Sequence, residues 1–334
     1  MEFNALVKSL RNDSGVTGSY KDDSNCSLAN VQYLMRSFEN VYVFGIGFIN
    51  VYNIYIIIMN TMYKYVYIRH GETEFNEHTQ LYDYNSIKCN YKYLNCKLSP
   101  KGETQAYELG KVIKDMNVKK VFVSPFKRSL QTATIMLKEY NKDNICVYVH
   151  PLLSEVVDSV QSLCCNVQEM KDEYNMNSNV KVNWSEYFDK EFISVKEQDL
   201  FCIGKYYIDT LSQKQRDKVV NPVYKAYDKD GNTNIPQLLG NVVTYAKKSG
   251  IKRLETVKHG YERAIKFKEF LKETFHNDDN TDNNVNDSDT VLIVTHKSFI
   301  KLSTTSSSLI NISNNKYPND CYTCNNCEMV YINI

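Results

Sequence analysis

Short apolar runs alternate with longer helical patterns over most of the chain, beginning near residue 63. The short runs are rich in β-branched and aromatic residues, which is typical of buried strands. They predict strands at residues 63–68, 118–123, 145–149, 291–294 and 329–334. Between the strands, apolar residues recur at every third or fourth position, the spacing of one helix face. This spacing predicts helices at residues 99–116, 127–140 and 256–275.

The first of these helices has a clear start in the sequence. Ser99 is a suitable N-cap because its hydroxyl can accept a hydrogen bond from a free backbone N–H of the first turn. Pro100 follows at the position where a missing N–H costs nothing. Ala106, Leu109 and Ile113 then share one face. The pattern therefore predicts a helix that begins at Ser99 and packs this face inward.

Alternating strands and helices predict an α/β fold of the three-layer α/β/α class, with a mostly parallel central sheet covered on both faces. Ligands of such sheets bind beyond the carboxyl ends of the strands. Polar residues stand at that position after four of the predicted strands. They are Arg69-His70, Ser124–Arg128, Leu152–Glu155 and Thr295-His296. We therefore expect four distant segments to meet at one rim of the sheet.

An N-terminal extension, residues 1–61, precedes the alternating pattern of the domain, residues 62–334. Its residues 41–59 are uncharged and apolar, and about 19 such residues just suffice to span a bilayer. Three interpretations compete: a signal-anchor helix, an apolar element packed on the domain, or a leader upstream of a true start at Met62. Membrane contact, and with it a membrane-anchored form, is expected only through this segment.

Two stretches interrupt the alternating pattern of the domain. Residues 169–250 are polar and weakly periodic, and we expect them to form a cap over the site. Residues 277–289 are a low-complexity run of Asn and Asp, which predicts a disordered loop inserted before a strand. Insertions of this kind are tolerated at a protein surface because loop closure entropy grows slowly with length.

Charge and cysteine content narrow the choice of partners. Forty basic and 39 acidic residues leave a formal net charge of +1, so no overall field favours nucleic acid. Ten cysteines without a disulfide framework predict reduced thiols and a cytoplasmic protein. Cys321, Cys324 and Cys327 allow a metal hypothesis. Structural thiols are the stronger interpretation, because a zinc site needs a fourth ligand and none is near in the sequence.

The central chemical feature is Arg69-His70-Gly71, at the end of a predicted strand. A neutral imidazole is a good nucleophile near neutral pH, because its unperturbed pKa is about 6.5. Gly71 lets the backbone approach a phosphate closely. Arg69 and Arg128 can each offer a planar fork to phosphate oxygens. Two such forks can hold a dianion without a metal, so we expect no metal and no cofactor.

Two further residues complete the predicted site. His296, as an imidazolium, would stabilise charge on the equatorial oxygens of a transferring phosphoryl group. Glu155 is the candidate proton donor, because a half-buried carboxyl can have its pKa raised to about 6–7 for that task; Asp158 is the alternative. No D-x-D pair follows a predicted strand, and no H-E-x-x-H or Walker-type loop occurs. A metal-dependent phosphatase or a kinase is therefore disfavoured.

Five segments resemble, in order, the motifs of the histidine phosphatase superfamily, in its phosphoglycerate-mutase-like family. They are YIRHGETEFN (67–76), LSPKGETQA (98–106), VFVSPFKRSLQTA (121–133), LLSE (152–155) and LIVTHKSFI (292–300). Each motif alone is common, whereas their occurrence in this order is specific. The late helix also resembles the family in Glu255-Thr256 and Arg263, where the motif is looser.

The resemblance implies roles for particular side chains. It implies a phosphohistidine intermediate on His70 and a phosphate pocket of Arg69, Arg128 and His296. It further places Asn76 near this pocket and makes Glu155 the proton donor. The expected partner is a phosphorylated small molecule or a phosphoprotein as substrate, and a homodimer is an expectation from the family alone.

Departures from the mutase pattern favour the phosphatase branch. Phe75-Asn76 keeps the family's aromatic-Asn pair, but residues 83–95 lack the Gly-Trp-type loop and residues 156–163 do not match the mutase signature. A mutase must exclude water, so we expect a phosphomonoester hydrolase. A cofactor-dependent phosphoglycerate mutase and a non-catalytic phospho-ligand binding protein are the alternatives. Lys297 replaces the usual Gly, and either adds a cation at the rim or narrows the site.

Overall fold

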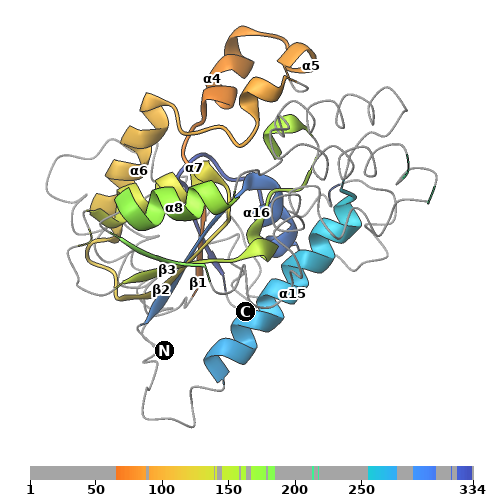
Figure 1. Cartoon of the computed structure of the whole chain (residues 1–334). Coiled ribbons are helices and arrows are strands. Elements are labelled where there is room, and N and C mark those ends of the chain that lie inside the picture. Colours follow the sequence, from red (N-terminus) through yellow and green to blue (C-terminus); the bar gives the residue numbers. More distant parts are fainter. Residues whose placement is uncertain are drawn as a thin grey trace, which may run out of the picture. The chain divides into compact units, whose positions relative to one another are not determined.

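The computed structural model describes most of the predicted domain (Figure 1). The described residues are 65–87, 90–138, 140, 145–157, 159–162, 167–177, 180–184, 213, 217, 255–276, 289–305, 317 and 322–332. The N-terminal extension, including residues 41–59, lies outside them, as do most of the expected cap and of the Asn/Asp-rich loop. Within the described part of the chain, no helix is long and apolar enough to cross a membrane.

Six strands form one sheet in the order β4-β3-β2-β5-β1-β6. They are β1 (Tyr65–Arg69), β2 (Val118–Val123), β3 (Cys146–Val149), β4 (Lys181–Asn183), β5 (Thr290–Thr295) and β6 (Met329–Ile332). Every neighbouring pair is parallel except β1 and β6, which are antiparallel. The predicted class, α/β with a mostly parallel central sheet, is confirmed.

The sheet is accompanied by helices of very different length. The short ones are α4 (Glu74–Leu81), α5 (Tyr84–Ile87), η1 (Tyr91–Tyr93), η2 (Pro151–Leu153), η3 (Val160–Ser162) and α16 (Lys297–Thr304). The longer ones are α6 (Pro100–Ile113), α7 (Lys127–Lys138), α8 (Val167–Asn177) and α15 (Val257–His276). Ser99 caps α6 as predicted, since its hydroxyl accepts from the Gly102 backbone N–H at 3.1 Å.

The strands bury both faces. Tyr67, Phe122 and Ile293 pack with α15 and α16 in one apolar cluster. Their neighbours Val66 and Leu292 point to the opposite face and are equally buried. On that second face α7 lies along β2 and β5 and packs against α6. Figure 1 shows the pair α6 and α7 apart from the pair α15 and α16. Burial of each large apolar side chain contributes roughly 1.5–3 kcal/mol.

The strand order creates a topological switch point at the neighbouring strands β1 and β5. The chain leaves β1 toward α6 on one face of the sheet, whereas it leaves β5 into α16 on the other face. Such a reversal is where open α/β sheets bind ligands, beyond the carboxyl ends of the strands. Arg69 is paired with Thr295 in the β1–β5 register. The residues that follow them, His70 and His296, therefore emerge side by side at this point.

The predicted strands and helices are confirmed to within a few residues at each end, and the structure adds one strand that was not predicted. Residues 169–250 were expected to form a cap, yet part of α8 and all of β4 fall in this range, and β4 pairs with β3 as a strand of the central sheet. The reason is local: β4 has three residues, two of them polar, and is too short to show alternation. Most of the remaining residues of the expected cap lie outside the described residues.

Candidate active site

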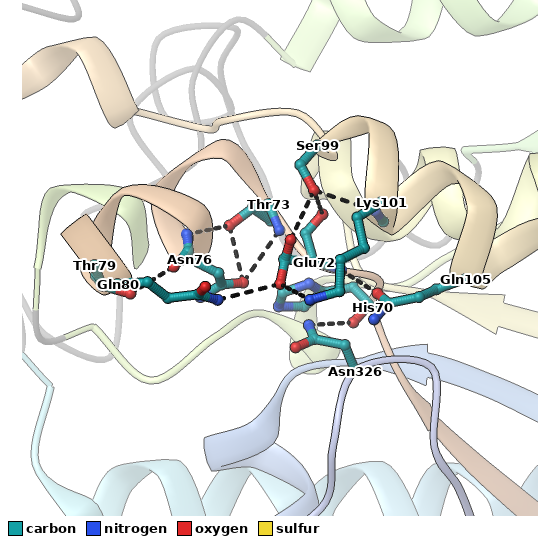
Figure 2. Close-up of polar contacts among 11 residues, drawn as sticks. His70, Glu72, Thr73, Asn76, Thr79, Gln80, Ser99, Lys101, Gln105 and Asn326 are labelled. Atoms are coloured by element: carbon teal, nitrogen blue, oxygen red, sulfur yellow. Dashed lines mark hydrogen bonds and ion pairs between the residues drawn. The ribbon is translucent and has the colours of Figure 1, made fainter.

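His70 is held at the carboxyl end of β1 by its backbone. Its N–H donates to the Thr295 carbonyl at 3.0 Å, which continues the β1–β5 ladder by one residue. Its carbonyl accepts from the Asn326 side-chain amide at 2.9 Å, and Figure 2 shows Asn326 directly beside it. Asn326 belongs to the turn before β6, so strands on both sides of β1 fix the position of this histidine.

The hydrogen bonds of the His70 ring define its tautomer. Nδ1 lies 2.7 Å from the Gly71 carbonyl oxygen, which can only accept, so Nδ1 carries the proton. Nε2 consequently has a lone pair, and it accepts from Nε of Arg128 at 3.2 Å. Nε2 is therefore the nitrogen that has the lone pair needed to attack phosphorus, and in this structure the lone pair accepts from the Arg128 guanidinium.

Arg128, the second residue of α7, is fully buried. Besides His70, it donates from Nη1 to the Gln161 carbonyl at 2.9 Å, and its guanidinium lies 4.5 Å from the centre of the Phe126 ring. A buried guanidinium keeps its charge because its pKa is far above neutral. It therefore places a permanent positive charge next to the nucleophilic nitrogen.

The surroundings of His70 keep its imidazole neutral. Burial lowers its pKa well below the ordinary value of a histidine, and the charges of Arg128 and Arg69 lower it further. The hydrogen bond to Gly71 acts in the opposite direction and is the weaker influence. A neutral imidazole among cations is attractive to an anionic phosphate and is able to attack it.

His296 lies against His70 with ring centres 5.1 Å apart. Its Nε2 forms a 2.7 Å hydrogen bond with the Ser124 hydroxyl, and the Phe126 ring packs edge-on at 4.8 Å. Its buried Nδ1 has no hydrogen-bond partner among the described residues. Burial, and then the charge of Arg128, lower its pKa well below the ordinary value. The unpartnered Nδ1 makes this ring a candidate phosphate ligand.

Arg69, the last residue of β1, is gripped by the turn before β6. Its carbonyl accepts from the Cys327 N–H at 2.9 Å, and its Nη1 donates to the Cys324 carbonyl at 3.2 Å. Its buried Nε has no hydrogen-bond partner among the described residues, and burial lowers the pKa of the guanidinium. Nη1 of this cation is therefore anchored, whereas its Nε lacks an acceptor within the described part of the chain.

Glu155 follows η2 and is buried. Its Oε1 accepts from the Val156 backbone N–H at 2.9 Å. Its charge acts on both Arg69 and Lys297, favouring the protonated form of each. Lys297 is half-buried at the first position of α16, and burial followed by the charge of Arg69 lowers its pKa. Glu155 thus faces the same cationic region from a separate segment.

Asn76 is placed differently from the other predicted residues. It stands at the third position of α4, where its Oδ1 accepts from the backbone N–H of Thr73 at 3.2 Å and from the Thr73 hydroxyl at 3.0 Å. Figure 2 shows its side chain turned toward Thr73. Its acceptor is engaged in capping α4, and phosphate binding by its amide stays a prediction.

The loop after His70 is held on α6 by Glu72 (Figure 2). The buried carboxylate of Glu72 accepts from Lys101 at 2.9 Å and from the Ser99 hydroxyl at 3.2 Å. Backbones also approach closely, because a Cβ on Gly71 would stand 2.6 Å from the carbonyl oxygen of Gly102. Glycine is therefore required here for packing, and it brings the loop onto the first turn of α6.

Several groups that hold the site together could not be predicted from the sequence. The Gly71 and Gln161 carbonyls act through the backbone, and Asn326 comes from a turn 256 residues after His70. Ser124 was foreseeable, because Val123 and Val294 are register partners in β2 and β5, which places the residues after them together.

In the described part of the chain, no three His, Cys, Asp or Glu side chains are grouped so that they could bind a metal ion. Burial raises the pKa of Cys324 to about 11 and that of Cys327 to about 12. Thiols of this kind stay protonated near neutral pH, which disfavours metal thiolates. Cys321, the first member of the predicted run, lies outside the described residues.

A family model described as histidine phosphatase superfamily (branch 1) matches residues 65–185, the part of the chain with His70, Arg128 and Glu155. For residues 65–185 this match confirms the predicted resemblance to the histidine phosphatase superfamily, and it supports an enzyme of the histidine phosphatase type.

Several solved structures resemble the chain. Phosphoserine phosphatase from Entamoeba histolytica, bound to 3-phosphoglyceric acid, is 16% identical, with a TM-score of 0.35 over 79% of this chain and 87% of that one. Bacillus stearothermophilus YhfR is 14% identical, with a TM-score of 0.36 over 76% and 85%. A mycobacterial glucosyl-3-phosphoglycerate phosphatase is 14% identical, with a TM-score of 0.35 over 75% and 82%.

Proposed function

We propose that this protein is a metal-independent phosphomonoester hydrolase that works through a phosphohistidine at Nε2 of His70. The observation that carries the proposal is the state of this ring: Nδ1–H donates to the Gly71 carbonyl, Nε2 keeps its lone pair, and Arg128 lies beside it. The lowered pKa of His70 favours the neutral, nucleophilic form. These features are what attack on an anionic phosphorus centre needs.

In the first step Nε2 forms a bond to phosphorus while the bond from phosphorus to the leaving oxygen breaks. Arg69, Arg128 and His296 stabilise the charge on the non-bridging oxygens, through donors that are fixed before the reaction begins. Glu155, protonated at this stage, gives its proton to the leaving oxygen. The alcohol departs and Glu155 is left as a carboxylate.

In the second step water attacks the phosphorus of phosphohistidine. Glu155 accepts a proton from this water, the bond between nitrogen and phosphorus breaks, and inorganic phosphate leaves. His70 returns to its neutral form with the proton still on Nδ1. The substrate class is a phosphorylated small molecule or a phosphoprotein.

The test is phosphoenzyme trapping on the full chain. Rapid quenching during turnover of an aryl phosphate should yield base-stable, acid-labile phosphate on the peptide that contains His70. His70→Ala should abolish both this label and turnover. The matched control is His78→Ala on α4, a histidine bonded to the Glu74 carbonyl outside the site, which should keep both. An active His70→Ala protein would rule the proposal out.

Mutase activity is measured in the same experiment. 3-Phosphoglycerate is supplied with and without 2,3-bisphosphoglycerate, and the products are separated. A hydrolase releases inorganic phosphate in both cases. Isomerisation that depends on the bisphosphate would replace the hydrolase proposal by the mutase alternative. Phosphate binding without any release of product would favour a non-catalytic binding protein.

A further inference from the structure

The segment that carries Glu155 is hydrogen-bonded to a buried arginine, Arg263, that comes much later in the sequence. Nη1 of Arg263, on α15, donates to the carbonyls of Leu152 at 2.7 Å and Ser154 at 2.8 Å, and its Nη2 donates to the carbonyl of Glu155 at 3.3 Å. Three carbonyls of one four-residue stretch thus converge on a single guanidinium. Their separation from Arg263 is 108 to 111 residues in sequence.

Glu255 holds this guanidinium from the other side. Its carboxylate accepts from Nε and Nη2 of Arg263 at 2.7 Å and 2.9 Å, a two-pronged pair in which both residues are 4% exposed. Glu255 also bonds to Val157 in both directions: its Oε2 accepts from the Val157 N–H at 3.2 Å, and its own N–H donates to the Val157 carbonyl at 3.0 Å. The pair therefore forms hydrogen bonds with the backbone before, at and after Glu155.

β5 contributes the remaining contact of the segment. The Thr295 hydroxyl donates to the Leu153 carbonyl at 2.7 Å. Thr295 immediately precedes His296, and its carbonyl accepts from the His70 N–H. One residue thus connects the Glu155 segment to both histidines of the site. The backbone of Glu155 is fixed relative to the nucleophile, and the charge of its carboxyl acts on Arg69 and Lys297.

We infer that the Glu255–Arg263 pair is a positioning device for proton transfer: it fixes the backbone of residues 152–157 so that the Glu155 carboxyl meets the leaving oxygen. The inference rests on the proposed function, in which Glu155 is the proton donor. A proton donor works only within hydrogen-bond reach of the leaving oxygen. Small misplacements of a reacting group are costly, about 10²-fold for 1 Å.

A purely structural pair would behave differently from a positioning pair. Loss of a structural pair lowers the fraction of folded enzyme and slows every substrate equally. Loss of a positioning pair slows only those substrates whose leaving oxygen needs a proton. p-Nitrophenolate can leave without protonation because p-nitrophenol is a much stronger acid than an alkanol, whereas an alkoxide requires the proton. The dependence of kcat on the leaving group therefore separates the two roles.

The experiment compares kcat and KM for p-nitrophenyl phosphate and for a simple alkyl phosphate, on folded full-length protein. The variants are Glu155→Gln, Arg263→Lys, which keeps the positive charge, and Glu255→Gln, which is nearly isosteric, so that at least one should fold. The matched control is Asp289→Asn, a buried carboxylate outside the site that pairs with Asn117 and Lys119.

For Glu155→Gln, we expect kcat with the alkyl phosphate to fall about 10²-fold or more, with little change for p-nitrophenyl phosphate. Arg263→Lys and Glu255→Gln should reproduce this selective loss in kcat, up to about 10²-fold, at nearly constant KM. Asp289→Asn should leave the ratio of the two substrates unchanged. The basic limb of the alkyl-phosphate pH profile should shift in the pair variants and not in the control.

Each failure has its own signature. If Glu155→Gln slows both substrates equally, the proton-donor assignment in the proposed function is wrong. If Glu155→Gln is selective but both pair variants slow the two substrates equally, the proposed function stands and the positioning inference is overturned. If the selective loss appears in Asp289→Asn as well, it reflects general destabilisation and again overturns the inference.

Discussion

Two arginines of this domain, Arg128 and Arg263, are both almost completely buried, yet their partners differ in kind. Arg263 donates to the Glu255 carboxylate and to three backbone carbonyls. Arg128 directs its Nε at a neutral imidazole nitrogen, that of His70. A guanidinium paired with a carboxylate has its charge offset, and its remaining N–H groups can hold backbone carbonyls in place. A guanidinium pointed at an imidazole instead imposes its charge on that ring and on whatever anion approaches it.

The largest effect is expected for Arg128. Arg128→Ala should lower kcat/KM for an aryl phosphate about 10²- to 10⁴-fold, because two charge-assisted hydrogen bonds of roughly 1.5–3 kcal/mol each are lost from the transition state. Arg128→Lys should recover part of the loss, since an ammonium keeps the charge but lacks the planar fork. Steady-state kinetics on folded protein check this. An unchanged kcat/KM in Arg128→Ala would contradict the role assigned to this residue.

Full removal of the Arg263 side chain should also lower stability. Arg263→Ala leaves the buried Glu255 carboxylate without its partner, and we expect the free energy of unfolding to fall by about 3–5 kcal/mol. A Glu255→Leu/Arg263→Met double variant should be less destabilised, because no buried charge is left alone. Denaturant unfolding of the single and double variants gives the coupling energy. Single and double variants of equal stability would show that the charge pairing contributes little.

The histidines near Arg128 should make stability depend on pH. The pKa values of folded His70 and His296 lie well below the ordinary value. Below about pH 6.5 these histidines bind protons in the unfolded chain but stay neutral in the folded protein. The free energy of unfolding should therefore fall as the pH decreases. The slope is at most about 1.4 kcal/mol per pH unit for each histidine. Unfolding at several pH values should show a flatter slope in His70→Ala/His296→Ala, and an unchanged slope would contradict this account.

The contrast also shows how far the sequence can be read. His70, Arg128 and His296 follow predicted strands, and the parallel register of β1, β5 and β2 brings the ends of these strands together. Their convergence was therefore predictable from the alternating pattern. The strands themselves were equally accessible, because continuous apolar runs such as Val291–Val294 are buried on both sides.

The hydrogen bonds from Arg263 to backbone carbonyls could not be predicted from the sequence. Backbone carbonyls have no residue identity, so the donation to Leu152, Ser154 and Glu155 leaves no pattern in the sequence. β4 was missed for a related reason, since three residues are too few to show a period. The capping of α4 by Asn76 was also unforeseen, because the family resemblance pointed this residue toward the phosphate.

The smallest effect is expected at Ser99, which touches neither arginine. Its hydroxyl caps α6 at the Gly102 N–H and contacts Glu72, the residue that holds the loop after His70. Ser99→Ala should lower the free energy of unfolding by about 1 kcal/mol, the usual contribution of an N-cap. The control is Thr104→Ala, whose exposed hydroxyl bonds to the Pro100 carbonyl within the same helix. Thermal unfolding should separate the two variants while kcat/KM changes little in either. A large loss of activity in Ser99→Ala would contradict this expectation. It would mean that the packing of the loop after His70 on α6 matters to catalysis as much as Arg128 does.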